Sequence, residues 1–110
     1  MVAQITTAQI RLGRTDDLIR VLQDIVAPTM TEQPGFQGLT LLIDPQTDRV
    51  LLLGLWATEA DLIASERRDP SHMQFATLDE LLEGSSLREA YEVILHVQMT
   101  ADGAARIRGI

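Results

Sequence analysis

Cysteine is absent from this chain of 110 residues. No disulfide, thiolate nucleophile or cysteine-ligated metal is therefore available, which suits a protein of a reducing compartment. Long apolar runs are also absent, and none approaches the roughly 20 residues that span a bilayer. The first residues contain no basic stretch that leads into a long apolar core, so we expect no signal peptide, no membrane partner and a cytoplasmic location.

Basic residues are scarce. Nine Lys and Arg residues oppose 16 Asp and Glu residues, which leaves a formal net charge of −7. Nucleic acids and anionic membrane surfaces bind proteins through clustered basic side chains. The adjacent basic pair Arg67 and Arg68 is followed at once by Asp69. We therefore expect no nucleic acid among the partners.

Motifs for cofactors and metals are missing as well. The sequence contains no glycine-rich dinucleotide loop, no phosphate-binding loop and no HExxH zinc motif. Its two histidines, His72 and His96, fall on different predicted elements and lack the spacing of metal ligands. We expect neither a bound metal nor a dedicated cofactor.

Hydrophobic residues make up 45% of the chain, which is enough for the core of one globular domain. Residues 34–65 are its most informative stretch. Pro34 and Gly35 interrupt the preceding element, and two apolar runs follow, separated by turn residues. This stretch predicts a strand at 36–44, a turn at 45–48, a strand at 50–56 and a helix whose start has the capping-box spacing of Thr58 and Asp61.

The flanking segments predict the rest of a single domain over residues 1–100. Thr15 is the predicted N-cap of a helix that Pro28 should kink or end near Met30. Gly84 is placed to end the helical segment that starts at Ser71. The predicted elements are a strand at 2–12, a helix at 15–30, a helical segment at 71–84, a last strand at 87–99 and a loosely ordered tail at 101–110. The order β-α-β-β-α-β predicts an α+β fold with a ferredoxin-like antiparallel sheet.

The two central strands also predict an assembly. Their residues are apolar on both faces, and residues 50–53 show no alternation at all. Strands of this kind are usually buried on both sides, yet the predicted helices suffice for only one face of a four-stranded sheet. A second copy, packed sheet against sheet, would cover the other face. We therefore expect a two-fold homodimer.

Three motifs carry a resemblance to a known family: PGFxG at residues 34–38, LLIDPQTDRV at 41–50 and LWATEADLIASE at 55–66. In this order and spacing they resemble the antibiotic-biosynthesis-monooxygenase-like (ABM) family. The resemblance implies a dimeric α+β barrel in which two ferredoxin-like sheets pack together. The family supports several functions on one scaffold, so function is argued from the site.

Members of the resembled family with known activity fall into two groups. One group oxidises polycyclic phenols with molecular oxygen, without metal or flavin, in a pocket between the sheet and the helices. The other degrades haem with an Asn on the first strand, a Trp on the second helix and a His beyond it. Here Thr6 and Ser65 occupy the first two positions, and His72 comes earlier than the third. We therefore reject haem degradation.

His72 is the candidate catalytic base. An imidazole near its ordinary pKa of about 6.5 can take a proton from a phenol at neutral pH. The favoured interpretation of His72 is nevertheless an exposed histidine without a role at the start of a helix. His96, in the middle of the predicted last strand, is interpreted as a hydrogen-bonded interface residue.

Four further residues are candidates for substrate binding. Gln4 and Thr6 are polar positions on a strand that should be largely buried, so they need partners either across the sheet and interface or in a ligand. Trp56 either packs between sheet and helix, which is favoured, or borders a flat ligand in the space beside Gly54. Tyr91 lies either in the core, which is favoured, or in a pocket wall.

Two hypotheses of function follow. The first is a cofactor-independent monooxygenase-like protein that acts on a small aromatic or polycyclic phenolic substrate with molecular oxygen. The alternative is a non-catalytic dimeric module of the same fold, which binds a small ligand or has only a structural role. Enzyme and binder share the pocket and differ in whether a proton acceptor such as His72 faces it.

Overall fold

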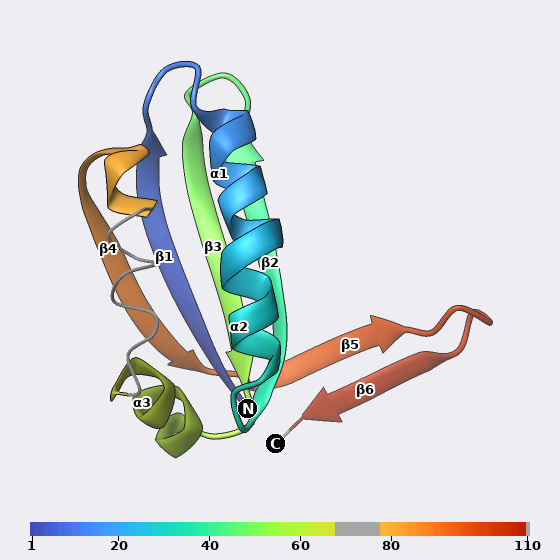
Figure 1. Cartoon of the computed structure of the whole chain (residues 1–110). Coiled ribbons are helices and arrows are strands. Elements are labelled where there is room, and N and C mark those ends of the chain that lie inside the picture. Colours follow the sequence, from blue (N-terminus) through green and yellow to red (C-terminus); the bar gives the residue numbers. More distant parts are fainter. Residues whose placement is uncertain (68–77, 110) are drawn as a thin grey trace.

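The computed structural model describes residues 1–67 and 78–109 as an α+β fold (Figure 1). Its elements, in chain order, are β1 (Val2–Ile10), α1 (Thr15–Val21), the π-helical segment η1 (Leu22–Val26), α2 (Ala27–Thr31), β2 (Phe36–Asp44), β3 (Arg49–Trp56), α3 (Glu59–Arg67), β4 (Leu82–Glu92), β5 (Leu95–Met99) and β6 (Ala105–Gly109).

Four strands form one antiparallel sheet in the order β2-β3-β1-β4. The continuous helical segment α1-η1-α2 lies along one face of this sheet, and α3 sits at the end where β3 leaves it (Figure 1). This order of strands and helices is the ferredoxin-like arrangement, so the predicted fold class is confirmed. The dimeric barrel involves a second copy and stays a prediction.

The core lies between the sheet and the helical segment. Leu18, Leu22 and Val26 recur every four residues, which places them on one face of a helix, and all three are buried. They pack against buried residues of β1, β3 and the segment that leads into β4: Ala8, Ile10, Val50, Leu78, Leu81 and Leu82. Full removal of a leucine, isoleucine or valine side chain from water contributes about 1.5–3 kcal/mol to the stability of the fold.

The first helix differs from the prediction at its start, and it contains the π-helical segment η1. Thr15 was the predicted N-cap, but α1 begins at Thr15 itself and Arg14 holds the cap position without a capping side-chain bond. Arg14 instead donates from Nε to the carboxylate of Asp17 at 2.7 Å. Pro28 lies in the first turn of α2, directly after η1. A proline ring clashes with the carbonyl four residues earlier in a regular α-helix, and the wider turn of η1 lies where that clash would fall.

The C-terminal part differs most from the prediction. The expected strand at 87–99 is two strands, because β4 begins at Leu82 and ends at Glu92 while β5 pairs with β6 outside the main sheet. Gly84 does not end a helix; it lies within β4 with φ of +73°. The pairing of β1 with β4 shifts register at this point, and glycine allows the backbone conformation that such a bulge requires.

Residues 101–110 were expected to be loosely ordered, and this is wrong for Ala105–Gly109, which forms β6. The turn before it is closed by a bond of 2.6 Å from the Thr100 amide to the Ala104 carbonyl. Asp102 accepts bonds there from the Thr100 hydroxyl and the Ala104 amide. These bonds lower the pKa of the Asp102 carboxyl below its ordinary value, since they favour its charged form.

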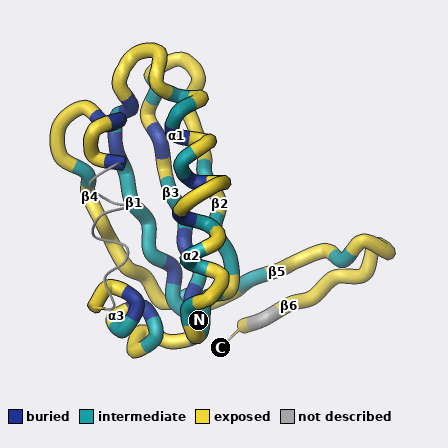
Figure 2. The backbone as a smooth tube through the Cα atoms, in the orientation of Figure 1, coloured by how far each residue is buried: buried dark blue, intermediate teal, exposed yellow. Residues whose placement is uncertain are grey.

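The face of the sheet opposite α1 is covered by no other layer of the described chain (Figures 1 and 2). One row across it joins Leu42, Leu51, Thr7 and Leu87, which are direct neighbours in the strand register. The three leucines of this row are 50%, 37% and 58% exposed. We call this surface the open face.

Candidate active site between the sheet and the helices

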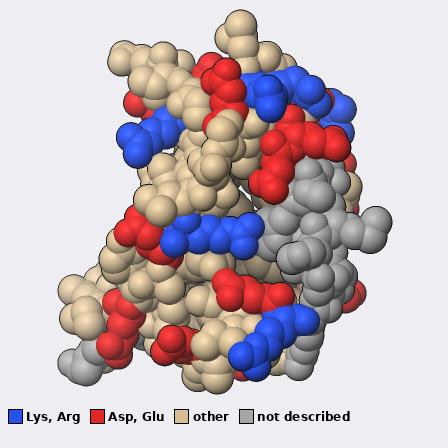
Figure 3. All heavy atoms as spheres, turned by 90° about the vertical axis from the view of Figure 1, so that its left-hand side faces the viewer, with Lys and Arg blue, Asp and Glu red and all other residues tan. Residues whose placement is uncertain are grey.

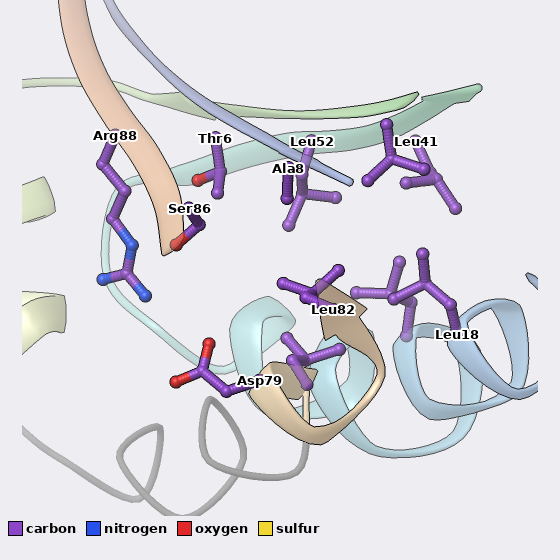
Figure 4. Close-up of a pocket in the computed structure, with 12 residues that line it drawn as sticks. Thr6, Ala8, Leu18, Leu41, Leu52, Asp79, Leu82, Ser86 and Arg88 are labelled. Carbon is purple, nitrogen blue, oxygen red and sulfur yellow. The ribbon is translucent and has the colours of Figure 1, made fainter. Parts of the chain in front are cut away.

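A pocket lies between the sheet and the helical segment α1-η1 (Figure 4). Most of its wall is apolar because the core residues of both layers meet there. Its lining consists of Thr6, Ala8, Leu18, Leu22, Leu41, Val50, Leu52, Leu78, Asp79, Leu82, Ser86 and Arg88.

The polar groups gather at one end of this pocket. Figure 4 shows Arg88, Ser86, Thr6 and Asp79 on one side, with Leu18 and Leu41 at the far end. Thr6 lies directly opposite Arg88 in the β1–β4 register, so both side chains project from the same face of the sheet. Ser86 is two residues before Arg88 on β4 and therefore shares that face. We call Thr6, Ser86, Asp79 and Arg88 the polar end.

The polar end suits an anionic ligand group. The guanidinium of Arg88 is a permanent cation with five N–H donors in one plane. The hydroxyls of Thr6 and Ser86 can each donate or accept a hydrogen bond. A flat molecule whose rings lie among the leucines would place a phenolate or carboxylate oxygen beside these groups. The Asp79 carboxylate adds a proton acceptor on the same side.

The pocket is narrow as it stands. Its volume is about 40 Å³, which is room for about three waters. A neighbouring groove between α1 and β2 offers about 310 Å³ by the same measure. Leu18, Leu22 and Leu41 line both spaces. Rotation of these three side chains would join the pocket to the groove.

Of the predicted site residues, Thr6 lines the pocket. Gln4 lies further along the same face of β1, where its side-chain amide donates to Glu66 of α3 at 2.7 Å. Trp56 does not line the pocket; it is 1% exposed and packs edge-on against Phe36 with ring centroids 5.3 Å apart. The position of Trp56 therefore fits the interpretation that it packs between sheet and helix. The hydrogen bond of Gln4 connects β1 to α3.

Tyr91 lies on the opposite side of the sheet from Thr6. It is 50% exposed, and its hydroxyl donates to the carboxylate of Glu89 at 2.6 Å. This hydrogen bond raises the pKa of the Tyr91 phenol above its ordinary value, since it favours the neutral form. Within one chain, Tyr91 therefore does not join Thr6 at the pocket.

Of the two histidines, His96 belongs to the described part of the chain, whereas His72 lies outside it. His96, on β5, borders a second hollow at the other end of the molecule, together with Gln98, Leu55 and Met1. His96 therefore lies away from the pocket between the sheet and the helices.

Sequence reasoning missed Arg88, Ser86 and Asp79. The only available signal was Arg88 itself, a lone basic residue in the segment predicted as the last strand. Its relevance depends on the register that sets it beside Thr6. Strand alternation alone does not predict which residues of two distant strands pair.

The fold and the pocket define the class: a small ferredoxin-like α+β protein with a narrow, largely apolar pocket between sheet and helices. A family model described as antibiotic biosynthesis monooxygenase matches residues 1–76. The chain belongs to the antibiotic biosynthesis monooxygenase family. No curated protein matches the sequence.

Solved structures show the same fold at low sequence identity. A monooxygenase from the ActVA-Orf6 gene of Streptomyces coelicolor, in complex with nanaomycin D, has a TM-score of 0.75 at 16% identity, with 90% of this chain and 92% of that chain covered. SnoaB, a cofactor-independent oxygenase from Streptomyces nogalater, has a TM-score of 0.74 at 17% identity over 84% and 91%. Rv0793 from Mycobacterium tuberculosis has a TM-score of 0.68 at 19% identity over 84% and 94%.

Neither a membrane-crossing helix nor a metal-holding cluster occurs in the described part of the chain. Over residues 1–67 and 78–109, no helix is long and apolar enough to cross a bilayer. The same residues contain no group of three or more acidic or histidine side chains that could hold a metal ion.

Proposed function

We propose that this protein is a cofactor-independent monooxygenase-like enzyme that oxidises a small aromatic or polycyclic phenol with molecular oxygen. The observation that carries the proposal is the placement of Arg88 at the polar end of an otherwise apolar pocket. Membership of the monooxygenase family supports the reaction class. Nanaomycin D, the ligand named for the Streptomyces coelicolor structure, supports a small-molecule substrate.

The reaction requires three contributions from the protein. A base must remove the phenolic proton, a cation must hold the resulting phenolate, and the walls must keep water out while oxygen reacts. Arg88 is the anion-holding group, with Thr6 and Ser86 as hydroxyl donors. The leucines lower the local dielectric, so the attraction between guanidinium and phenolate is far stronger than in water.

The substrate supplies all the electrons in this reaction. A ring methylene activated by the phenolate is converted to a carbonyl: one oxygen atom stays on the ring carbon, and the second leaves as water with the two methylene hydrogens. His72 remains the proposed base. Asp79 is a second candidate, because its carboxylate lies at the polar end, and the two candidates are distinguished by substitution.

A two-fold homodimer through the open face completes the proposed assembly. Leu42, Leu51 and Leu87 are substantially exposed in one row across all four strands. A second copy that packs its own open face on this row removes those leucines from water. The family resemblance implies the same dimer.

The alternative is a non-catalytic module that binds a small ligand, and one observation favours it. The pocket interior of about 40 Å³ is much smaller than the roughly 300–1,000 Å³ of typical ligand sites. A polycyclic phenol enters only if Leu18, Leu22 and Leu41 move aside. A smaller aromatic anion needs less rearrangement.

Oxygen uptake with a hydroxylated anthrone tests the proposal, with ¹⁸O₂ used to trace one oxygen atom into the product. Arg88→Gln should lower kcat by about a hundredfold or more, because loss of one preorganised anion-binding donor typically costs 10²–10³ in rate. Arg20→Gln is the matched control, since its side chain is 70% exposed on α1. Equal rates for both variants would remove Arg88 from the mechanism.

The base is identified by the pH dependence of the same rate. His72→Ala should abolish a titration in the rate near neutral pH if His72 is the base. Loss of oxygen uptake in Asp79→Asn, with His72→Ala still active, would assign the base to Asp79 instead. A ligand that binds in calorimetry without any oxygen uptake would favour the binding module instead.

A further inference from the structure

One row of pocket-lining residues crosses the whole sheet. From β2 at one edge to β4 at the other, the row consists of Leu41, Leu52, Thr6 and Arg88, which are direct partners in the strand register. All of them line the pocket, so their side chains lie on the helix side of the sheet. Neighbouring strands are about 4.8 Å apart, so three steps separate Arg88 from Leu41 by about 14 Å. The site therefore has a long axis that runs across the strands.

The two ends of this row differ in polarity. Arg88 lies on β4, and acidic and basic side chains are interspersed on this side of the molecule (Figure 3). Figure 4 shows Leu41 at the other end, together with Leu18 of α1. The groove between α1 and β2 adjoins that end, and its lining in the described part of the chain contains no charged residue. A ligand that follows the row passes from a cation at β4 to apolar side chains at β2.

The groove presents apolar surface to solvent. Ile19 and Ile43 both line it, and they are 38% and 39% exposed. Ile19 follows Leu18 by one position, which turns it about 100° around the helix from the core toward β2. Ile43 shares the helix-facing side of β2 with Leu41, two residues away. A single exposed isoleucine is ordinary, but two that line the same groove form a contiguous apolar patch of the kind that marks a binding groove.

The groove is also the roomier part of the site. Its volume of about 310 Å³, against about 40 Å³ for the pocket, reaches the lower end of the roughly 300–1,000 Å³ of typical ligand sites. Leu18, Leu22 and Leu41 line both spaces, so the groove continues the pocket. The polar residues of its lining, Thr15 and Gln23, mark where the apolar surface ends.

We propose that the groove binds the apolar end of the substrate, and that the site selects elongated phenols whose apolar substituent lies opposite the hydroxyl. The inference rests on the anion-binding role proposed for Arg88. Because Arg88 holds the phenolic oxygen at β4, only a molecule that extends away from that oxygen reaches β2. Ile19 and Ile43 are then the specificity-determining residues, through the apolar area that they cover on the substrate.

Calorimetric titration of the full-length chain with para-alkylphenols, from ethyl to hexyl, tests the groove without depending on oxidation. Each methylene removed from water tightens binding about fourfold. The two ligands differ by four methylenes and the groove is open on one side, so we expect the Kd to fall at least about thirtyfold from ethylphenol to hexylphenol.

Ile19→Trp fills the groove and should abolish this gain, while the Kd of ethylphenol stays unchanged. The matched control is Ile25→Trp, because Ile25 is 43% exposed on the same helical segment and lines neither the pocket nor the groove. Ile43→Gln is a second probe, since it keeps the space and removes apolar surface. It should weaken the binding of hexylphenol more than that of ethylphenol.

The outcomes separate the groove from the proposed reaction. Equal Kd values for the two alkylphenols, or a gain that survives both Ile19→Trp and Ile43→Gln, would overturn the groove, and oxidation of the anthrone would then leave the proposed function standing. Groove-dependent binding without any oxygen uptake would keep the groove and refute the monooxygenase. Failure of every alkylphenol to bind would overturn the groove together with the phenol site at Arg88.

Discussion

Leu22→Ala is the substitution whose effect on the pocket and on stability can be worked out most fully from the structure. Leu22 begins η1, is 5% exposed, and lines both the pocket and the groove beside it. Truncation removes three carbon atoms from the wall that separates these two spaces. The same change therefore weakens the core and opens the candidate site.

The stability cost follows from burial. Removing a buried leucine side chain to Cβ costs about 2–5 kcal/mol, with the upper values where the surroundings cannot collapse. Leu22 contacts the rigid sheet on one side, so we expect about 3 kcal/mol. That is a large share of the roughly 5–15 kcal/mol that stabilises a typical domain, and it should lower Tm by roughly 10 °C or more.

Urea unfolding at one fixed protein concentration provides the assay. Trp56, the only tryptophan, is 1% exposed and packs on Phe36, so its fluorescence reports loss of the core. Ile25→Ala is the control, because Ile25 lies in the same segment and is 43% exposed; it should cost about 0.5–1 kcal/mol. Equal costs for the two variants would refute the packing of η1 on the sheet.

The enlarged pocket gives Leu22→Ala a second signature. Apolar cavities made by leucine truncation stay dry and bind small aromatic molecules. A simple phenol at millimolar concentration should therefore raise the Tm of this variant more than that of the unsubstituted protein. No difference in the shift would mean that the pocket and the groove do not merge.

Three other predictions concern single residues. Tyr91 should titrate above the ordinary phenol pKa of about 10, and Glu89→Gln should lower its pKa toward that value. The stabilisation by this hydrogen bond is present below the unfolded pKa and is lost as pH rises through the folded one. Ultraviolet absorbance of the single tyrosine measures this, and identical titrations would contradict it. Gly35→Ala should destabilise by at least about 1–3 kcal/mol in urea unfolding, because φ is +80° and the new methyl would overlap the Asp61 side chain; a neutral result would refute this strain. Thr58→Ala should cost about 1 kcal/mol, because the Thr58 hydroxyl accepts the Asp61 amide at 3.1 Å; Thr58→Ser, which keeps the cap, should cost much less.

Several features of the fold were predictable because they depend on neighbours in sequence. The capping spacing of Thr58 and Asp61 predicted the start of the helix, and the hydroxyl-to-amide bond there confirms it. Pro28 predicted that the regular first helix would kink or end, and the π-helical segment η1 directly precedes the turn that holds Pro28. Each of these signals acts over about four residues.

The candidate site was predictable only in part. Thr6 was identified as a polar residue of a buried strand, and it lies in the pocket. Trp56 and Tyr91 were grouped with it, but one is packed on Phe36 and the other lies on the open face. Arg88 escaped notice because its alignment with Thr6 depends on the long-range pairing of β1 with β4.

By itself, the sequence determined the family, the α+β order of elements and the apolar periodicity that builds the core, since short-range spacing and composition encode these directly. Only the tertiary structure decided which side chains share a site. The pairing of β1 with β4 brings Thr6 and Arg88 together across 82 positions of the chain, and the hairpin at 95–109 exists because β5 meets β6 rather than β1. Long-range register sets these contacts, and a single residue of slip turns every side chain of a strand to the other face.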